Sequence, residues 1–164
     1  MNKHMLSVLV ENNSGVLSRI AGLFSRRGYN IDSLSVGVTE NPDISRMTIT
    51  VTGDDYILEQ IKKQLNKLIN VIKVVELKPE KSVYRELILV KVKAHAEDRT
   101  VIKETVNIFR ANIVDISPKT LTVEMTGDAG KISAFVDVIK PFGIIELVRT
   151  GFTGMQRGGI KITD

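Results

Sequence analysis

Side chains that could carry out catalysis are few and widely spaced in this sequence. The 164 residues include no cysteine, which excludes disulfides, thiolate nucleophiles and cysteine-bound metals. The two histidines, His4 and His95, have neither a second histidine nor a carboxylate at the spacing of a metal site. No serine stands in a Gly-x-Ser-x-Gly motif, and no glycine-rich phosphate loop is present. We therefore predict no catalytic residue and no bound metal.

Two pairs of neighbouring acids, Asp54-Asp55 and Glu97-Asp98, stand just before predicted helices. Negative charge is stabilised at a helix N-terminus by capping and by the helix dipole. A structural role therefore accounts for both pairs.

The turn Asn12-Asn13-Ser14-Gly15 offers groups that could bind a small anion. It joins an apolar run of strand length to a helical pattern that begins at Val16, and a helix N-terminus presents unpaired backbone amides that suit a carboxylate. Gly15 leaves room for a ligand, and Asn12 can both donate and accept hydrogen bonds.

An amino-acid ligand also needs an apolar pocket for its side chain, and apolar residues are found near this turn. Val16, Leu17 and Ile31 could form the wall of an apolar pocket. On spacing alone, a simpler interpretation is that Asn13 or Ser14 merely caps the helix.

The elements that would position this turn follow from hydrophobic periodicity. The first half predicts the order strand, helix, strand, strand, helix, strand, over residues 4–11, 16–27, 29–38, 45–52, 55–70 and 71–77. Gly28 is placed to end the first helix. Two right-handed crossovers fold this order into a four-stranded antiparallel sheet with two helices on one face.

The same order is repeated in the second half. Residues 48–54 match residues 121–128 at the end of the third strand, and Asn30-Ile31 matches Asn112-Ile113. A polar, proline-containing linker separates the copies. We predict an α+β protein with two tandem ferredoxin-like βαββαβ domains, at residues 1–78 and 82–164.

Each predicted domain is small, and a single core of this size gives a narrow stability margin. Its edge strands also leave backbone groups that a second identical sheet can pair. We expect a homodimer through the first domain, and a chain ending near Pro79 should keep this property.

Composition and charge limit the cellular locations and the functions that fit this sequence. The net charge is +4, but basic residues are interleaved with acidic ones, and no apolar stretch is long enough for a membrane span or a signal core, so we expect a cytoplasmic protein. RNA-recognition domains share the predicted topology, which leaves RNA binding as the alternative function. Residues 45–51 lack the aromatic side chains on which such domains stack bases.

Several stretches of the sequence resemble the small regulatory subunits of acetolactate synthase, a family with ACT domains. The resemblance extends over essentially the whole chain, and it is carried by residues 6–19, 23–34, 45–48, 108–110 and 151–158. It implies that the first domain is an ACT domain that senses an effector and dimerises, and that the second is an ACT-like domain.

The resemblance also implies a function. In the family, valine binds near the dimer interface and inhibits a separate catalytic large subunit, which the small subunit activates. That partner carries thiamine diphosphate, magnesium and, in most members, FAD, so no cofactor is expected on this chain. The implied effector-binding residues are Asn12, Ser14, Gly15, Val16, Asn30 and Ile31.

Overall fold

The computed structural model describes residues 2–164 and contains two compact units. The first unit comprises residues up to Tyr84 together with the C-terminal tail, Phe152–Asp164, and the second comprises Arg85–Gly151. The predicted linker between the domains, residues 78–82, lies just before the end of this first segment. The prediction assigned residues 152–164 to the second domain, whereas in the structure this tail packs on the first unit.

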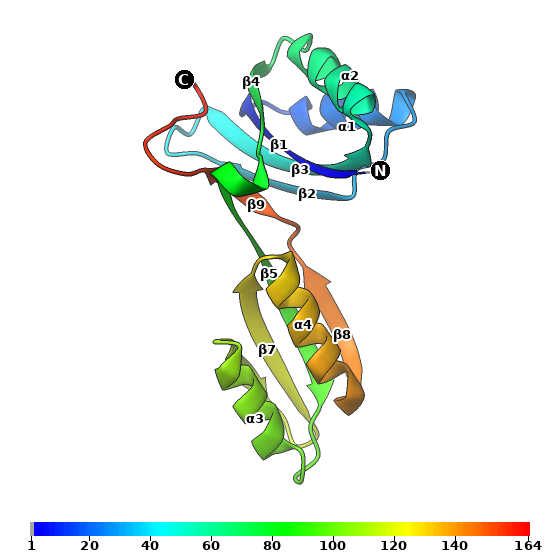
Figure 1. Ribbon diagram of the computed structural model, residues 1–164, viewed down its shortest axis with the longest axis vertical. Coiled ribbons are helices and arrows are strands. Elements are labelled where there is room, and N and C mark those ends of the chain that lie inside the picture. Colours follow the sequence, from blue (N-terminus) through cyan, green and yellow to red (C-terminus); the bar gives the residue numbers. More distant parts are fainter. Residues whose placement is uncertain (1) are drawn as a thin grey trace. The chain divides into compact units, whose positions relative to one another are not determined.

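The first unit is a four-stranded antiparallel sheet with two helices on one face (Figure 1). The strand order is β2-β3-β1-β4, so β2 and β4 are the edges. The elements in chain order are β1 (Asn2–Glu11), α1 (Val16–Arg26), β2 (Ser33–Val38), β3 (Ile44–Gly53), α2 (Asp55–Asn66) and β4 (Val71–Glu76). This confirms the predicted topology.

Alternation along the two central strands explains where the core of the first unit lies. Every second residue of β1 and β3 points to the helices, where it meets apolar side chains from α1 and α2. The fully buried members of this cluster include Leu6, Val8, Ile20, Phe24, Met47, Ile49, Ile61 and Leu65.

The end of α1 and the start of α2 follow their predicted signals, whereas the predicted cap of the helix that follows Glu97-Asp98 is wrong, because no side chain caps its N-terminus. Gly28 adopts the left-handed conformation (φ 67°) just after α1, and the amide of Tyr29 donates to the carbonyl of Phe24 in a Schellman-type end. The carboxylate of Asp54 accepts a hydrogen bond from the amide of Ile57 and so caps α2.

The second unit repeats this architecture with the strand order β6-β7-β5-β8. Its two helices and the inner face of its sheet form a separate core. Asp128 caps α4 as Asp54 caps α2. A short 3-10 helix, Pro79–Lys81, precedes β5 (Ser82–Lys93), and the other elements are α3 (Arg99–Ile108), β6 (Asn112–Ile116), β7 (Thr120–Gly127), α4 (Ala129–Ile139), the 3-10 helix Lys140–Phe142, and β8 (Ile144–Arg149).

The two copies differ between the first helix and the strand that follows it. Asn112 pairs with Glu124 at the start of β6, and the corresponding position at the start of β2 is Ser33, which pairs with Thr50. The predicted match of Asn30-Ile31 with Asn112-Ile113 therefore holds when counted from the helix end but not in strand register. Residues 30–32 are an extra loop that the second unit lacks.

The tail covers the helix-free face of the first sheet. Its strand β9 (Thr153–Gln156) pairs with β5, and the amide of Arg157 donates to the carbonyl of Lys81 over 2.9 Å. The amide of Gly154 donates to Thr48 Oγ1 on this face of β3. Phe152 is buried and packs edge-on against Tyr84.

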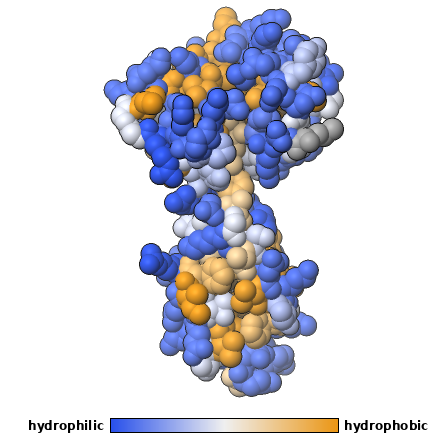
Figure 2. All heavy atoms as spheres, viewed as in Figure 1, coloured by the Kyte–Doolittle hydropathy of each residue, from blue (hydrophilic) through white to orange (hydrophobic). Residues whose placement is uncertain are grey.

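Exposed apolar side chains interrupt the polar surface, which Figure 2 shows from one side. They include Val36 and Val38 on the edge strand β2. Within residues 2–164, no helix is both long enough and apolar enough to cross a membrane.

Candidate functional site

The predicted anion-binding turn is open at its centre. Gly15 is the residue before the first turn of α1, and its left-handed backbone (φ 85°) suits glycine because a side chain there is strained. A Cβ added to Gly15 would meet no atom within 4 Å. The space beside the helix N-terminus is therefore large enough for a ligand group.

No side chain caps α1 or α3, in contrast to α2 and α4. The side chain of Asn13 instead donates to Glu11 Oε2 over 3.1 Å, while Ser14 is exposed in the turn. The simpler interpretation, in which Asn13 or Ser14 caps the helix, is wrong for this structure. The amide of Val16 donates to the carbonyl of Asn13 over 3.4 Å, and the amides of Leu17 and Ser18 are left for an acceptor from outside the helix, such as a carboxylate.

Asn12 fixes the turn to the loop between β2 and β3. Its backbone amide donates to the carbonyl of Asp43 over 2.7 Å, and its side-chain amide donates to the carbonyl of Pro42 over 2.9 Å. One strand end and one hairpin loop thus hold Asn12 in place at the edge of the turn.

Three residues that the sequence did not indicate brace the other side of the turn. Glu11 Oε2 accepts from the side-chain amide of Asn70 over 2.8 Å as well as from Asn13, and Arg19 donates to Asn70 Oδ1. The backbone amide of Glu11 donates to the carbonyl of Asn70. This network ties the turn to α1 and to the start of β4.

The structure places Val16 differently from the predicted pocket wall. Its side chain is 3% exposed and belongs to the core, so only its backbone can face a ligand at the turn. Leu17 is 42% exposed and is the apolar side chain of the first helical turn that remains at the surface.

Asn30 and Ile31 lie in the extra loop of residues 30–32. Asn30 is exposed and donates to Asp32 Oδ1 over 2.9 Å, while Ile31 packs partly against the core. Asp32 holds this loop to β3, because its amide donates to the carbonyl of Thr50 and its carboxylate accepts from Thr52.

The turn and this loop lie at opposite ends of the sheet. Asn12 is bonded to Asp43 and Asp32 to Thr50, seven positions farther along the chain through β3. At about 3.3 Å per strand residue, the two groups are roughly 20 Å apart along the sheet. A single chain therefore does not bring Asn12, Ser14 and Gly15 together with Asn30 and Ile31.

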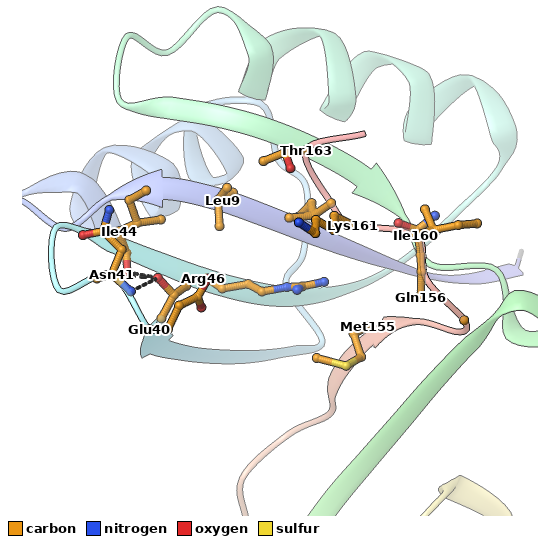
Figure 3. Close-up of a pocket in the computed structure, with 13 residues that line it drawn as sticks. Leu9, Glu40, Asn41, Ile44, Arg46, Met155, Gln156, Ile160, Lys161 and Thr163 are labelled. Atoms are coloured by element: carbon orange, nitrogen blue, oxygen red, sulfur yellow. Dashed lines mark hydrogen bonds between the residues drawn. The ribbon is translucent and has the colours of Figure 1, made fainter.

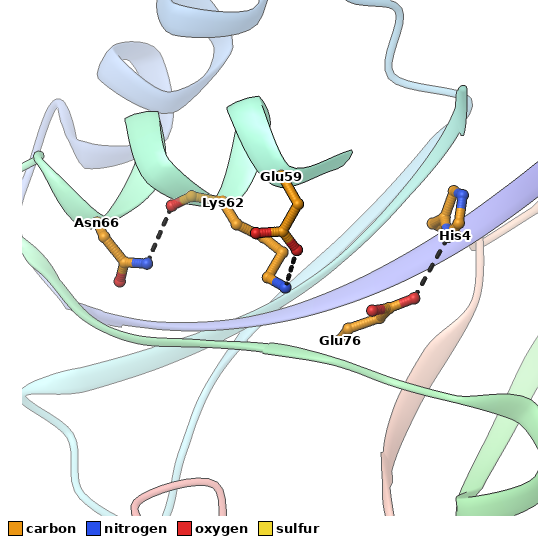
Figure 4. Close-up of polar contacts among 5 residues, drawn as sticks. All are labelled: His4, Glu59, Lys62, Asn66 and Glu76. Atoms are coloured by element: carbon orange, nitrogen blue, oxygen red, sulfur yellow. Dashed lines mark hydrogen bonds and ion pairs between the residues drawn. The ribbon is translucent and has the colours of Figure 1, made fainter. Parts of the chain in front are cut away.

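Two pairs of titratable groups in the first unit have structural roles. His4 Nδ1 lies 3.3 Å from Glu76 Oε1 between neighbouring strands, and Lys62 pairs with Glu59 across one turn of α2 (Figure 4). His95 is exposed. Within the part of the chain that the structure describes, no three histidine, aspartate or glutamate side chains are grouped to hold a metal ion.

The central strands also lack a surface for stacking bases. On the helix-free face of the first sheet, β1 and β3 present no aromatic side chain. Leu9, Arg46 and Thr48 lie on this face, and the tail covers Thr48. Neither central strand of the second sheet carries an aromatic residue within Arg85–Gly151. Nothing in the fold supports the RNA-binding alternative.

Comparison with known proteins agrees with this description. Residues 6–73 match the family model described as "AHAS small subunit-like ACT domain", and residues 85–158 match "Small subunit of acetolactate synthase". The acetolactate synthase small subunit of Mycobacterium bovis is 59% identical over 94% of this chain and 92% of its own length. A probable acetolactate synthase small subunit of Archaeoglobus fulgidus is 57% identical over 97% and 99%.

A solved structure shows the same fold over almost the whole chain. The acetolactate synthase small subunit of Thermotoga maritima superposes with a TM-score of 0.90 at 41% identity, covering 98% of this chain and all of that one. Together, the matching models, the relatives and this structure show that the chain belongs to the family of acetolactate synthase small subunits.

Proposed function

We propose that this chain binds a branched-chain amino acid, most simply valine, at the turn of residues 12–15 and thereby inhibits a separate catalytic large subunit that it otherwise activates. The observation that carries the proposal is the uncapped N-terminus of α1 beside Gly15. The effector carboxylate would accept hydrogen bonds from the first-turn amides, where the helix dipole favours negative charge.

The expected affinity is modest. Burial of a valine side chain contributes about 1.5–3 kcal/mol, and the helix N-terminus contributes about 0.3–2 kcal/mol. Contacts to the ammonium group must supply much of the rest. One methylene changes the free energy of binding by only about 1–3 kcal/mol, so the pocket would discriminate weakly between valine, leucine and isoleucine.

A homodimer would complete the site. If two copies of the first unit pair antiparallel through β2, the start of β2 in one copy lies beside the end of β2 in the other. Asn30 and Ile31 of one copy then approach the end of the sheet that holds the turn of the other. Pairing through the opposite edge, β4, would leave residues 30–32 far from any second turn.

The exposed residues of β2 favour this mode of pairing. Val36 and Val38 are 46% and 60% exposed, and an edge strand offers unpaired backbone groups to a partner strand. The extra loop of residues 30–32 is present only in the first unit, which favours that unit as the sensing one.

The chemistry of acetolactate formation is assigned to the catalytic subunit, with its thiamine diphosphate, magnesium and FAD. The role of this chain is to bind the effector and to bias the catalytic subunit through their interface. Linkage makes that coupling reciprocal, with a typical size of about 1–3 kcal/mol.

Reconstitution tests the proposal. The purified chain alone should form no acetolactate from pyruvate with added thiamine diphosphate and magnesium, whereas addition of the chain should activate the catalytic subunit and make it sensitive to valine. Calorimetry should detect binding of valine but not of single-stranded RNA. Turnover by the chain alone, or RNA binding without valine binding, would contradict the proposal.

A further inference from the structure

A cavity of about 450 Å³ lies within the first unit, between the helix-free face of the sheet and the tail (Figure 3). The sheet side contributes Leu9, Ile44 and Arg46, and the tail side contributes Met155, Ile160 and Lys161. The volume is in the range of small-molecule sites. The cavity shares no residue with the turn of residues 12–15.

Arg46 is positioned like a carboxylate-binding group. Its Nε donates to Ser7 Oγ over 2.8 Å, and Ser7 is fully buried on the neighbouring strand β1. This bond fixes the plane of the guanidinium group and leaves its terminal nitrogens for another acceptor. A fixed guanidinium binds a carboxylate with two parallel hydrogen bonds.

The electrostatic environment of Arg46 also favours an anion. Burial lowers the pKa of Arg46, and the nearby carboxylate of Glu40 offsets part of this effect. Among residues 2–164, however, no ion pair joins Arg46 to Glu40. A half-buried cation without a close counter-ion gains from an anionic ligand.

The charges that line the cavity do not balance. Arg46 and Lys161 are cationic and Glu40 is anionic, while the other lining residues are neutral. One carboxylate would neutralise the set. Leu9, Ile44 and Met155 supply apolar surface for a short alkyl group beside it.

We infer that this cavity is a second ligand site, which binds a small aliphatic carboxylate through Arg46 beneath the tail. Both an α-amino acid and a 2-oxo acid with a branched alkyl group have this chemistry. Glu40 would distinguish them, because only the amino acid offers an ammonium group to it. The inference does not depend on the proposed valine site at the turn.

Titration of the full-length chain tests the site. The probes are 2-oxoisovalerate, valine, and isobutylamine, which keeps a similar alkyl group but has no carboxylate. Gly15→Asp serves as the background protein, since a carboxylate at the turn should suppress binding there. We expect saturable binding of 2-oxoisovalerate or valine and none of isobutylamine, measured by calorimetry and by amide chemical shifts of residues 44–46 and 155–161.

Arg46→Gln should weaken that binding about tenfold to a hundredfold, as expected for the loss of charge-assisted hydrogen bonds. Arg26→Gln, on the exposed face of α1, is the matched control and should bind normally. Glu40→Gln should weaken the binding of valine, which loses a partner for its ammonium group, and should strengthen the binding of 2-oxoisovalerate, whose carboxylate no longer lies near a like charge.

Circular dichroism must show that Arg46→Gln is folded. The inference is overturned if neither acid binds to the Gly15→Asp protein, or if a folded Arg46→Gln chain binds as well as the Arg26→Gln control. It is also overturned if isobutylamine binds as tightly as the acids.

Discussion

The backbone conformation of Gly15 determines which substitutions the turn can tolerate. Its φ of 85° lies in the left-handed region, where a residue other than glycine costs about 1–2 kcal/mol and asparagine and aspartate are tolerated best. Open space around the missing Cβ means that this strain is the main structural cost of a short side chain. Charge can therefore be tested separately from shape.

Gly15→Asp should abolish inhibition by valine while activation of the catalytic subunit is retained. The new carboxylate would compete with the effector carboxylate for the same amides and would repel it. The measurement is the activity of the reconstituted complex across valine concentrations.

Two further variants separate the effect of the new charge from the effects of side-chain shape and backbone strain. Gly15→Asn has nearly the same shape without the charge and should keep part of the valine response. Gly28→Asn introduces similar strain at the other end of α1, where φ is 67° and no atom is near, and should respond like wild type. If Gly15→Asp and wild type are inhibited by the same valine concentrations, the effector binds elsewhere.

At the residue scale, sequence reasoning succeeded where the signal is local. The stop at Gly28 and the cap at Asp54 depend on neighbours within a few positions, and both are confirmed. The network of Glu11 with Asn70 joins residues 59 positions apart, so no local pattern could indicate it. The alternative interpretation, a cap by Asn13 or Ser14, is wrong because Gly15 stands at the N-cap position of α1 and no side chain caps the helix.

The edge strand β2 is the element on which the proposed dimer depends. A double variant, Val36→Lys with Val38→Lys, should shift the chain from dimer to monomer in analytical ultracentrifugation. Antiparallel pairing of two such edges would bring four lysines together, and like charges on facing strands are destabilising. Loss of valine binding should accompany dissociation.

Ile69→Lys is the control for that double variant. Ile69 is 89% exposed, more than either valine, but it lies between α2 and β4, away from the β2 edge. It should leave the dimer intact. A double variant that remains dimeric would show that the copies associate through another surface.

The tail is the element whose packing could not be predicted from the sequence. The repeated order of strands and helices ends with β8, and residues after it have no counterpart in the first copy that could indicate their position. Their attachment depends on long-range contacts, such as that of Gly154 with Thr48, 106 positions earlier. The prediction that residues up to about Pro79 suffice for dimerisation does not take into account that the tail covers one face of the first sheet.

Removal of the tail should therefore destabilise the first unit. A chain ending at Gly151 loses β9 and the buried Phe152, and loss of a buried phenylalanine side chain alone typically costs about 3–5 kcal/mol. A chain ending at Arg157 keeps β9 and should be much closer to wild type. Thermal unfolding of the three chains is the measurement, and equal stability would show that the tail contributes little.

At the scale of the whole molecule, the proposed site belongs to the dimer and not to either chain. The turn and residues 30–32 lie at opposite ends of one sheet, so two-fold symmetry would produce two equal sites, each with a turn from one copy and a loop from the other. The family and the fold could be predicted from the sequence. The separation of the turn from residues 30–32 could not, because it follows from the strand register.

Chains with Gly15→Asp and chains with Asn30→Ala should each fail to bind valine as homodimers, yet recover binding when they are mixed and allowed to exchange. In a heterodimer, one site combines both defects, while the other combines the intact turn of the Asn30→Ala chain with the intact loop of the Gly15→Asp chain. Random exchange should therefore restore about a quarter of the wild-type number of sites. Calorimetric stoichiometry after mixing measures this fraction, and mixing two Gly15→Asp samples is the control. If mixing restores no binding although mass spectrometry shows heterodimers, each site lies within one chain and the proposed geometry is wrong.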